Sequence, residues 1–232
     1  MQDPEYVREA FAGIAERYVV TNHVLSLGID ILWRRRVARM VREISPSRVL
    51  DVATGSGDMA IEIKRICPDI GVVGTDFCKP MLDQARRRGL KNTVLADALN
   101  LPFQDGEFCA LTVCFGLRNM EDWERALKEM GRVLKPGGKL VVLDFSLPRG
   151  KLTRGIYRFY LHTVLPILAG IITGRREAYR YLGGSIEAFP SGQEMCDLIE
   201  IAGFCETRQK PLFPGVATIY SAIKANEAGM CE

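Results

Sequence analysis

The chain has 232 residues, of which 47% are hydrophobic and 25% charged, and its formal net charge is +3. This length suits one large domain, and the composition excludes a predominantly disordered chain. The small net charge gives no support for a nucleic-acid-binding protein. The acidic start MQDPEYVREAF lacks the basic and apolar regions of a signal peptide. We therefore expect one globular domain in the cytoplasm.

Residues 1–45 are expected to form an N-terminal helical cap, with helices over 6–18 and 31–43. From residue 46 to residue 146, short apolar runs alternate with helical periodicity. The expected strands are 48–52, 71–75, 93–96, 108–115 and 139–145, and the expected helices are 60–66, 80–88 and 123–134. Apolar strands that alternate with helices predict an α/β fold of the Rossmann-like class, in which a mostly parallel sheet carries helices on both faces.

The sequence after residue 146 departs from this alternation. Residues 147–190 are rich in aromatic residues and arginines and are expected to form an insertion that closes the ligand crevice as a lid. Residues 191–202 predict a helix that ends at Gly203, and two further strands are expected over 206–210 and 216–224. The complete sheet is therefore expected to have seven strands.

The stretch VLDVATGSGD, residues 49–58, indicates a nucleotide loop between the first strand and the first helix. Gly55, Gly57 and Ala60 match the G-x-G-x-x-A pattern, and Asp76 follows about twenty residues later. This pattern alone does not separate a nicotinamide or flavin dinucleotide from S-adenosylmethionine, because both ligands carry a ribose.

Three carboxylates at successive strand ends favour S-adenosylmethionine. Asp51 precedes the loop, where a carboxylate suits an ammonium group better than a pyrophosphate. Asp76 is placed to accept hydrogen bonds from ribose hydroxyls, and Asp97 to accept one from the adenine amino group. One adenosyl ligand with a zwitterionic tail accounts for all three acids, whereas a dinucleotide accounts for one. A dehydrogenase remains the alternative, and NAD binding would distinguish it.

Several motifs carry a family resemblance. Class I S-adenosylmethionine-dependent methyltransferases have stretches similar to VLDVATGSGD, GTDFCKPML, ADALNLPF and LKPGGKLVVLDFS. A narrower resemblance, to the ubiquinone/menaquinone biosynthesis C-methyltransferases, rests on FGLRNMEDWERAL, RYVVTNHVLSLGIDILWRR and AYRYLGGSIEAFPSGQEMCDLIEIAGF. It extends from about Tyr6 to Lys224. It implies C-methylation of a prenylated quinol, either demethylmenaquinol or 2-polyprenyl-6-methoxy-1,4-benzoquinol, and the sequence does not distinguish the two.

The resemblance also implies the cofactor contacts. Together with the residues of the nucleotide loop, the expected cofactor-binding set is Asp51, Gly55, Ser56, Gly57, Asp76, Phe77, Asp97, Ala98 and Cys114. The chain departs from the family pattern at two positions. Val19 follows Tyr18 where the family usually has an acid, and Cys114 stands where a serine is common.

Methylation of a ring carbon requires the adjacent hydroxyl to lose its proton. A free phenol has a pKa near 10, so keeping it ionised at neutral pH requires about 4 kcal/mol of stabilisation. Arg118 and Asn119 follow the fourth strand, at the edge where such sheets bind ligands. The hypothesis is that Arg118 offsets the developing oxyanion and that Asn119 orients the ring or a water. The alternative is a structural salt bridge from Arg118 to Glu121 or Asp122.

The remaining catalytic and substrate candidates lie in the N-terminal motif. Tyr18 or a water is expected to relay the proton, and Asn22 and His23 are expected to contact substrate, with helix packing as the alternative. No metal site is expected, because the chain has two histidines and no CxxC pair.

Residues 163–174, TVLPILAGIITG, form an uncharged run that is too short to span a bilayer, which needs about 20 residues. Arginines bracket this run, at positions 149, 154 and 158 before it and 175, 176 and 180 after it. An apolar patch rimmed by cations can contact the inner face of the cell membrane. A helical lid over the methyl-transfer pocket is the other interpretation, and the two are compatible.

Other functions remain open at this stage. The runs Arg34–Arg36 and Arg86–Arg88 are expected to be solvated helix faces and not an RNA-binding surface, because no aromatic platform accompanies them. The oligomeric state is open, a homodimer included. Rival functions are a methyltransferase for another small aromatic or lipid acceptor, and a non-catalytic S-adenosylmethionine-binding assembly subunit.

Overall fold

The computed structural model describes residues 28–173 and 176–226, together with residues 5, 8, 9, 12, 13 and 26. Within these ranges it does not describe the side chains of residues 169, 171–173 and 176–181. The predicted helix over 6–18 lies largely outside the described residues. The candidate residues Tyr18, Asn22 and His23 lie outside them altogether.

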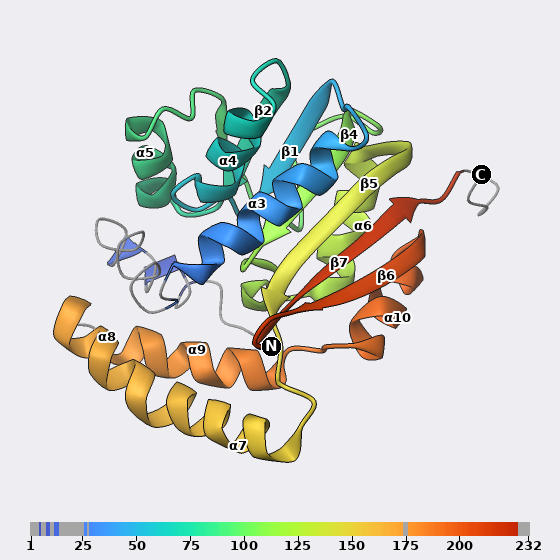
Figure 1. Ribbon diagram of the computed structural model, residues 1–232. Helices are drawn as coiled ribbons and strands as arrows, with labels where there is room; N and C mark the ends of the chain where they lie inside the picture. The colour runs from blue at the N-terminus through green and yellow to red at the C-terminus, as the bar shows by residue number, and fades with distance from the viewer. Residues whose placement is uncertain are drawn as a thin grey trace.

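A seven-stranded sheet forms the centre of the molecule, in the order β3-β2-β1-β4-β5-β7-β6 (Figure 1). Its strands are β1 (Arg48–Val52), β2 (Gly71–Asp76), β3 (Thr93–Leu95), β4 (Phe108–Cys114), β5 (Leu134–Phe145), β6 (Phe204–Leu212) and β7 (Ala217–Lys224). The strands from β3 to β5 are parallel, β7 is antiparallel to β5, and β6 is antiparallel to β7. The predicted fold class is confirmed.

Alternate residues of the central strands belong to two different hydrophobic cores, as a sheet covered on both faces requires. Leu50 and Val52 of β1 pack with α6 (Trp123–Val133) and α10 (Gln193–Ile201). Val49, which directly precedes Leu50, points to the opposite face and packs with α3 (Ile29–Arg42) and α4 (Asp58–Ile66). Helix α5 (Lys79–Arg87) contributes the buried Ala85 to the same core as α3. Helices therefore cover both faces, as the alternation of the sequence predicts.

Strand β5 begins five residues before the expected strand 139–145, so Pro136–Gly138 lie inside it. Its first residue, Leu134, pairs with Phe108 before the register shifts. The backbone folds back on itself at this irregularity, and glycine is needed at position 138. A Cβ there would lie 2.7 Å from the carbonyl oxygen of Lys135. The strand is longer than predicted because the pairing of β5 with β4 continues on both sides of the register shift.

The insertion after β5 forms a separate helical layer made of α7 (Lys151–Phe159), the π-helical turn η2 (Tyr160–Val164), α8 (Leu165–Thr173) and α9 (Arg176–Ala188). This layer lies across the end of the molecule at which β5 terminates (Figure 1). A small core built around Leu161, Leu165 and Ile186 holds it together, and Phe145 at the end of β5 packs against that core. Among the described residues, no helix combines the length and apolar character that crossing a membrane requires.

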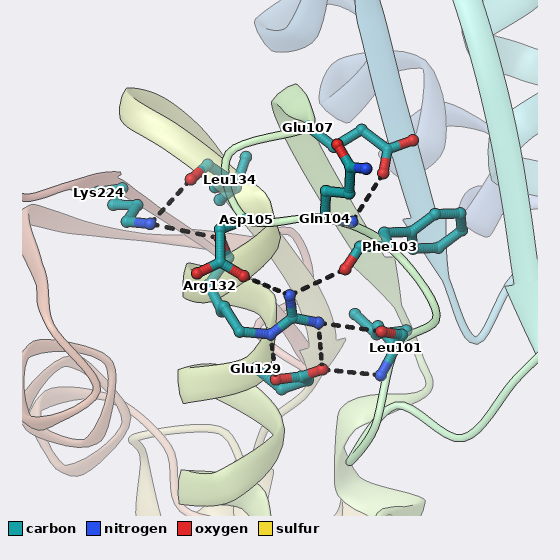
Figure 2. A network of polar contacts seen from close by, with 9 residues as sticks. All are labelled: Leu101, Phe103, Gln104, Asp105, Glu107, Glu129, Arg132, Leu134 and Lys224. Atoms are coloured by element: carbon teal, nitrogen blue, oxygen red, sulfur yellow. Dashed lines mark hydrogen bonds and ion pairs between the residues drawn. The ribbon is translucent and has the colours of Figure 1, made fainter.

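A polar network centred on Arg132 of α6 fixes the loop between β3 and β4 (Figure 2). The guanidinium donates to the backbone oxygens of Leu101 and Phe103, at 2.9 and 2.8 Å, and pairs with the carboxylates of Glu129 and Asp105. Glu129 in turn accepts from the backbone nitrogen of Leu101, at 2.8 Å. This network anchors the loop whose first residues follow β3 at the ligand-binding edge of the sheet.

Candidate active site

A cleft opens at the carboxyl ends of the parallel strands, where sheets of this topology bind ligands. It encloses about 1070 Å³, including its open mouth. Residues 51–56, 58, 59, 75–77, 81, 96–99, 114–116 and 119–121 line it, together with Arg34. All nine predicted cofactor-binding residues except Gly57 are in this lining, and Gly57 lies between two residues that are. The structure thus brings together positions that are far apart in the sequence.

The nucleotide loop depends on backbone conformations that favour glycine. Gly57 begins helix α4 with a φ of 84°, and Gly55 has a φ of 55°. In the neighbouring loop after β4, a Cβ at Gly116 would lie 2.5 Å from the Cβ of Ala53, which itself has a φ of 51°. The loops after β1 and β4 therefore approach closely enough to form a narrow wall for a ligand.

Asp76, at the end of β2, is held by the loop in front of it. The Gly55 nitrogen donates to its Oδ2 at 2.8 Å, and the Cys78 nitrogen donates to its Oδ1 at 2.9 Å. Burial raises the pKa of Asp76 to about 6, although these backbone hydrogen bonds oppose the shift. A carboxylate has about four acceptor positions, more than its backbone donors use, so it can still accept from a ribose hydroxyl.

Asp51, in β1, is only 1% exposed, and both its oxygens accept hydroxyl hydrogen bonds. Thr54 and Thr112 each donate to it at 2.6 Å. Burial raises the pKa of Asp51 to about 6, although the two hydroxyls and the charge of Arg34 oppose the shift. A cationic ligand group beside this carboxylate would favour its ionised form.

The third carboxylate, Asp97, lies two residues beyond β3 and is more exposed than the other two. Its Oδ1 accepts from the Leu99 nitrogen at 2.9 Å, which holds the short turn that follows. Ala98 lines the cleft beside it, and Cys114 lines the cleft from the end of β4. Burial, followed by the charge of Asp51, raises the pKa of the Cys114 thiol, so this side chain is a neutral thiol in the cleft.

The sequence of the chain identifies its family. The model of the ubiE/COQ5 methyltransferase family matches residues 1–224. The chain belongs to this family. It is 48% identical to the demethylmenaquinone methyltransferase of Thermus thermophilus, over 90% of this chain and 97% of that protein. It is 41% identical to the ubiquinone/menaquinone biosynthesis C-methyltransferase UbiE of Geobacter sulfurreducens, over 95% of this chain and 89% of that protein.

The fold agrees with this membership of the ubiE/COQ5 methyltransferase family. A solved structure of an S-adenosylmethionine-dependent methyltransferase from Thermotoga maritima matches with a TM-score of 0.66. The match covers 94% of this chain and 99% of that one, at 21% sequence identity, and shows the fold alone. The chain is a methyltransferase with a seven-stranded Rossmann-like sheet.

Two further observations test whether this methyltransferase cleft suits an adenosyl sulfonium. Gly116 leaves no room for a side chain beside Ala53, so the loop after β4 packs directly against the nucleotide loop there. Thr75 lines the cleft, and its buried hydroxyl has no hydrogen-bond partner among the described residues. The polar groups of the cleft therefore include three carboxylates, the unpaired Thr75 hydroxyl and the backbone of the glycine loop. This chemistry fits an adenosyl group with a cationic tail.

The structure places Arg118 and Asn119 in the turn η1 (Leu117–Asn119), directly after β4. The Asn119 side chain lines the cleft, whereas Arg118 is 3% exposed and does not. The Arg118 Nη1 atom lies 2.7 Å from Oδ1 of Asp144 and donates to the Phe115 carbonyl at 2.6 Å. A salt bridge from Arg118 is thus present, but the partner is Asp144 and not Glu121 or Asp122, because η1 packs against the end of β5.

The prediction that Arg34–Arg36 is a solvated helix face is wrong for Arg34. This side chain is buried, pairs with Asp30 and lines the cleft, although Arg36 and the run Arg86–Arg88 are exposed. The sequence carried a usable signal, since Arg34 precedes the apolar residues Val37 and Ala38 by three and four positions, on one helix face. In the described part of the chain, no cluster of side chains could hold a metal ion.

Proposed function

We propose that this methyltransferase uses S-adenosylmethionine to methylate a ring carbon of a prenylated quinol, with demethylmenaquinol as the first candidate substrate. The observation that carries the proposal is the cleft itself. It gathers the motif residues of the family at one edge of the sheet, in a chain 48% identical to a demethylmenaquinone methyltransferase. The relative named for both ubiquinone and menaquinone supports 2-polyprenyl-6-methoxy-1,4-benzoquinol as the second candidate.

The cofactor would be held by residues of the cleft wall. Asp76 would accept from the ribose hydroxyls, Asp97 and Ala98 would hold the adenine, and Asp51 would bind the methionine ammonium. Gly55, Ser56, Gly57, Phe77 and Cys114 complete the wall. When bound, S-adenosylmethionine supplies an electrophilic methyl group on a sulfonium.

The turn after β4 would act on the quinol. Asn119 lines the cleft, so its amide can hydrogen-bond to a ring hydroxyl or to a water beside it. Arg118 is neutralised by Asp144 and holds the Phe115 carbonyl, so its role in the proposal is to position the turn that carries Asn119. Tyr18, Asn22 and His23 remain predictions for proton relay and substrate contact, because they lie outside the described residues.

The test is methylation of demethylmenaquinol by the purified protein, followed by mass analysis of the quinone. We expect a product one methyl group heavier, formed only in the presence of S-adenosylmethionine. An Asn119→Ala variant is expected to keep cofactor affinity and to lose most turnover. Expression in cells that lack their own quinone methyltransferase provides the second measurement. No methylated quinone in either assay, from a protein that binds the cofactor, would point to a different acceptor or to a non-catalytic subunit.

The proposal extends to a membrane surface, since a prenylated substrate resides in lipid. Helix α7 buries none of its residues, and Leu152, Ile156 and Phe159 are 78%, 62% and 63% exposed on one helix face. These side chains precede the run 163–174, in which Leu165 is buried and Ile167 is 44% exposed. Among the described side chains of the insertion, the most exposed apolar ones therefore lie on α7, before the segment that the sequence indicated.

The charges around α7 match an anionic leaflet. Between Ser146 and Thr173 the chain has no aspartate or glutamate, whereas it has four cationic residues, Arg149, Lys151, Arg154 and Arg158. All four are exposed, although Arg158 also pairs with Glu187 of α9 at 2.7 Å. Each cation near an anionic surface contributes about 1 kcal/mol, and each buried apolar side chain about 1.5–3 kcal/mol. We propose that α7 lies on the membrane surface through this face.

Vesicle sedimentation tests the membrane contact. We expect the protein to bind vesicles of phosphatidylcholine with phosphatidylglycerol more strongly than vesicles of phosphatidylcholine alone. The double variant Ile156→Ser/Phe159→Ser is expected to lose at least tenfold in binding. Ile201→Ser is the matched control, because Ile201 is 64% exposed on α10. Equal binding by the double variant and the control would exclude α7 as the contact surface.

A further inference from the structure

Arg34 is the only cationic side chain among the described residues that line the cleft. The cleft is otherwise acidic, since Asp51, Asp58, Asp76, Asp97 and Glu121 all contribute to its wall. Arg34 is 8% exposed, and Asp58 and Asp30 keep it charged. Burial lowers the pKa of its guanidinium, but these carboxylates outweigh burial and raise it overall. A buried cation in an acidic cleft marks the place at which a negative ligand group would be stabilised.

The guanidinium of Arg34 is only partly used by the protein. Its Nη1 donates to Asp30, one turn earlier on α3, and its Cζ lies 5.3 Å from the centroid of the Phe115 ring. No other hydrogen bond from this side chain is present within the described part of the chain. A guanidinium has five N–H donors, so donors remain for a ligand carboxylate.

The methionine end of S-adenosylmethionine carries an ammonium and a carboxylate on the same carbon. The acids of the cleft suit the ammonium, the ribose hydroxyls and the adenine amino group, but they repel the carboxylate. Arg34 and Asp51 interact electrostatically, and the charge of Arg34 opposes the rise in the pKa of Asp51. A cation and an anion at one end of the cleft form a complementary pair for a zwitterion.

We propose that Arg34 binds the α-carboxylate of S-adenosylmethionine, opposite the ammonium group held at Asp51. This inference rests on the proposed function, because it assumes that the cleft binds this cofactor. It assigns a specific role to α3, which lies before the nucleotide loop in the sequence. The proposal also gives a function to the burial of Arg34 at the cleft, whereas Arg36, two residues later, is exposed.

The sharpest test compares S-adenosylmethionine with its decarboxylated form, because the two ligands differ only in the carboxylate. A charged hydrogen bond contributes about 1.5–3 kcal/mol, which corresponds to an affinity ratio of about 10- to 150-fold. We expect the unmodified protein to prefer S-adenosylmethionine by such a ratio in titration calorimetry. Arg34→Met is expected to remove this preference by weakening S-adenosylmethionine alone. The affinity for the decarboxylated ligand is expected to change by less than about threefold.

A matched variant controls for folding. Arg34→Met removes the cation that pairs with the buried Asp30, so Asp30→Asn/Arg34→Met is measured alongside it. Asp30→Asn alone retains the guanidinium, and we expect it to keep the preference for the carboxylated ligand. Equal losses for both ligands in the two variants that lack Arg34, or no loss for either, would overturn the carboxylate assignment. If the unmodified protein bound neither ligand, the proposed cofactor itself would be wrong, and the two failures are thereby distinguished.

Discussion

Arg118 and Asp144 form a buried ion pair that joins the turn after β4 to the end of β5. The Nη1–Oδ1 distance is 2.7 Å, and the Arg118 backbone nitrogen also donates to Oδ2 of Asp144 at 3.3 Å. The two side chains are 4% and 0% exposed. The Arg118 Cζ atom lies 5.1 Å from the centroid of the Phe145 ring. The turn η1 and the base of the α7–α9 layer therefore share one electrostatic anchor.

Removing one partner of this pair is expected to cost much more than removing both. Asp144→Leu leaves an uncompensated buried cation, and we expect the free energy of unfolding to fall by about 3–5 kcal/mol in urea denaturation. Arg118→Met/Asp144→Leu replaces both charges by apolar side chains and is expected to recover most of that loss. A double variant no more stable than Asp144→Leu would contradict this prediction.

The same double variant separates two roles for Arg118. A positioning role predicts lower turnover with an unchanged pH profile, because no charge is lost from the substrate site. Direct stabilisation of the oxyanion predicts a profile shifted to higher pH, because the ring hydroxyl would ionise less readily. Cofactor affinity measured on the same protein shows whether the cleft is intact. We expect the unshifted profile.

Cofactor affinity is expected to fall as the pH drops through 6. Burial raises the pKa values of Asp51 and Asp76 to about 6, so only about one-tenth of each is ionised at pH 5. If the ligand requires the carboxylates, titration calorimetry at pH 5 and pH 7 is expected to differ by about tenfold for each group. Equal affinities at the two pH values would contradict ligand contacts by these acids.

Folding stability is expected to change in the opposite direction over this range. The pKa values of about 6 in the folded protein lie above the ordinary value of 3.8. The contribution of these two groups to stability is therefore fully present below pH 3.8 and is lost as the pH rises through about 6. Thermal unfolding of the ligand-free protein at each pH provides the control, because acid unfolding would otherwise resemble loss of binding.

Gly116→Ala is expected to disturb the cleft wall. The new Cβ would lie 2.5 Å from the Cβ of Ala53, which belongs to the nucleotide loop, so one of the two loops must move. We expect a loss of about 1–3 kcal/mol in stability and at least tenfold in cofactor affinity. Gly155→Ala is the matched control. Its Cβ would meet no atom within 4 Å on helix α7, and a gain of about 0.5–1 kcal/mol is expected. Unchanged cofactor binding by Gly116→Ala would show that the loops do not form the wall.

Arg132 is expected to stabilise the loop between β3 and β4 more than an ordinary surface cation would. Arg132→Met removes the guanidinium hydrogen bonds to the carbonyls of Leu101 and Phe103 and to the Glu129 carboxylate, so we expect a loss of about 2–3 kcal/mol in urea denaturation. Lys128→Met, on the same helix, removes the pair with Glu124 in which both side chains are about half exposed. That variant is expected to change stability by less than about 1 kcal/mol. Similar losses of stability for the two variants would show that the Arg132 network stabilises the protein no more than an exposed ion pair does.

The period of the apolar residues fixed much of the fold in advance. Leu50 and Val52 alternate with Val49 because side chains of a strand point to opposite faces, and this alternation predicted a sheet covered on both sides. Asp76 was predictable from its spacing after the glycine loop, since the end of β2 must lie beside the end of β1 in a parallel sheet. These inferences rest on local geometry that repeats regularly along the chain.

Contacts between distant segments lay beyond such reasoning. The partner of Arg118 is Asp144, 26 residues later, and not the acids three or four positions away, because the packing of η1 against β5 decides which carboxylate it meets. Helical periodicity places Arg34 on the same face as the apolar Val37 and Ala38, but it does not show that this face meets the cleft. The burial of Arg34 follows from the rotation of α3 against the cleft. Sequence periodicity thus determined the layers and the ligand-binding edge, whereas the balance of charges within the cleft was decided by tertiary packing, because electrostatic partners are set by distance in space and not by separation along the chain.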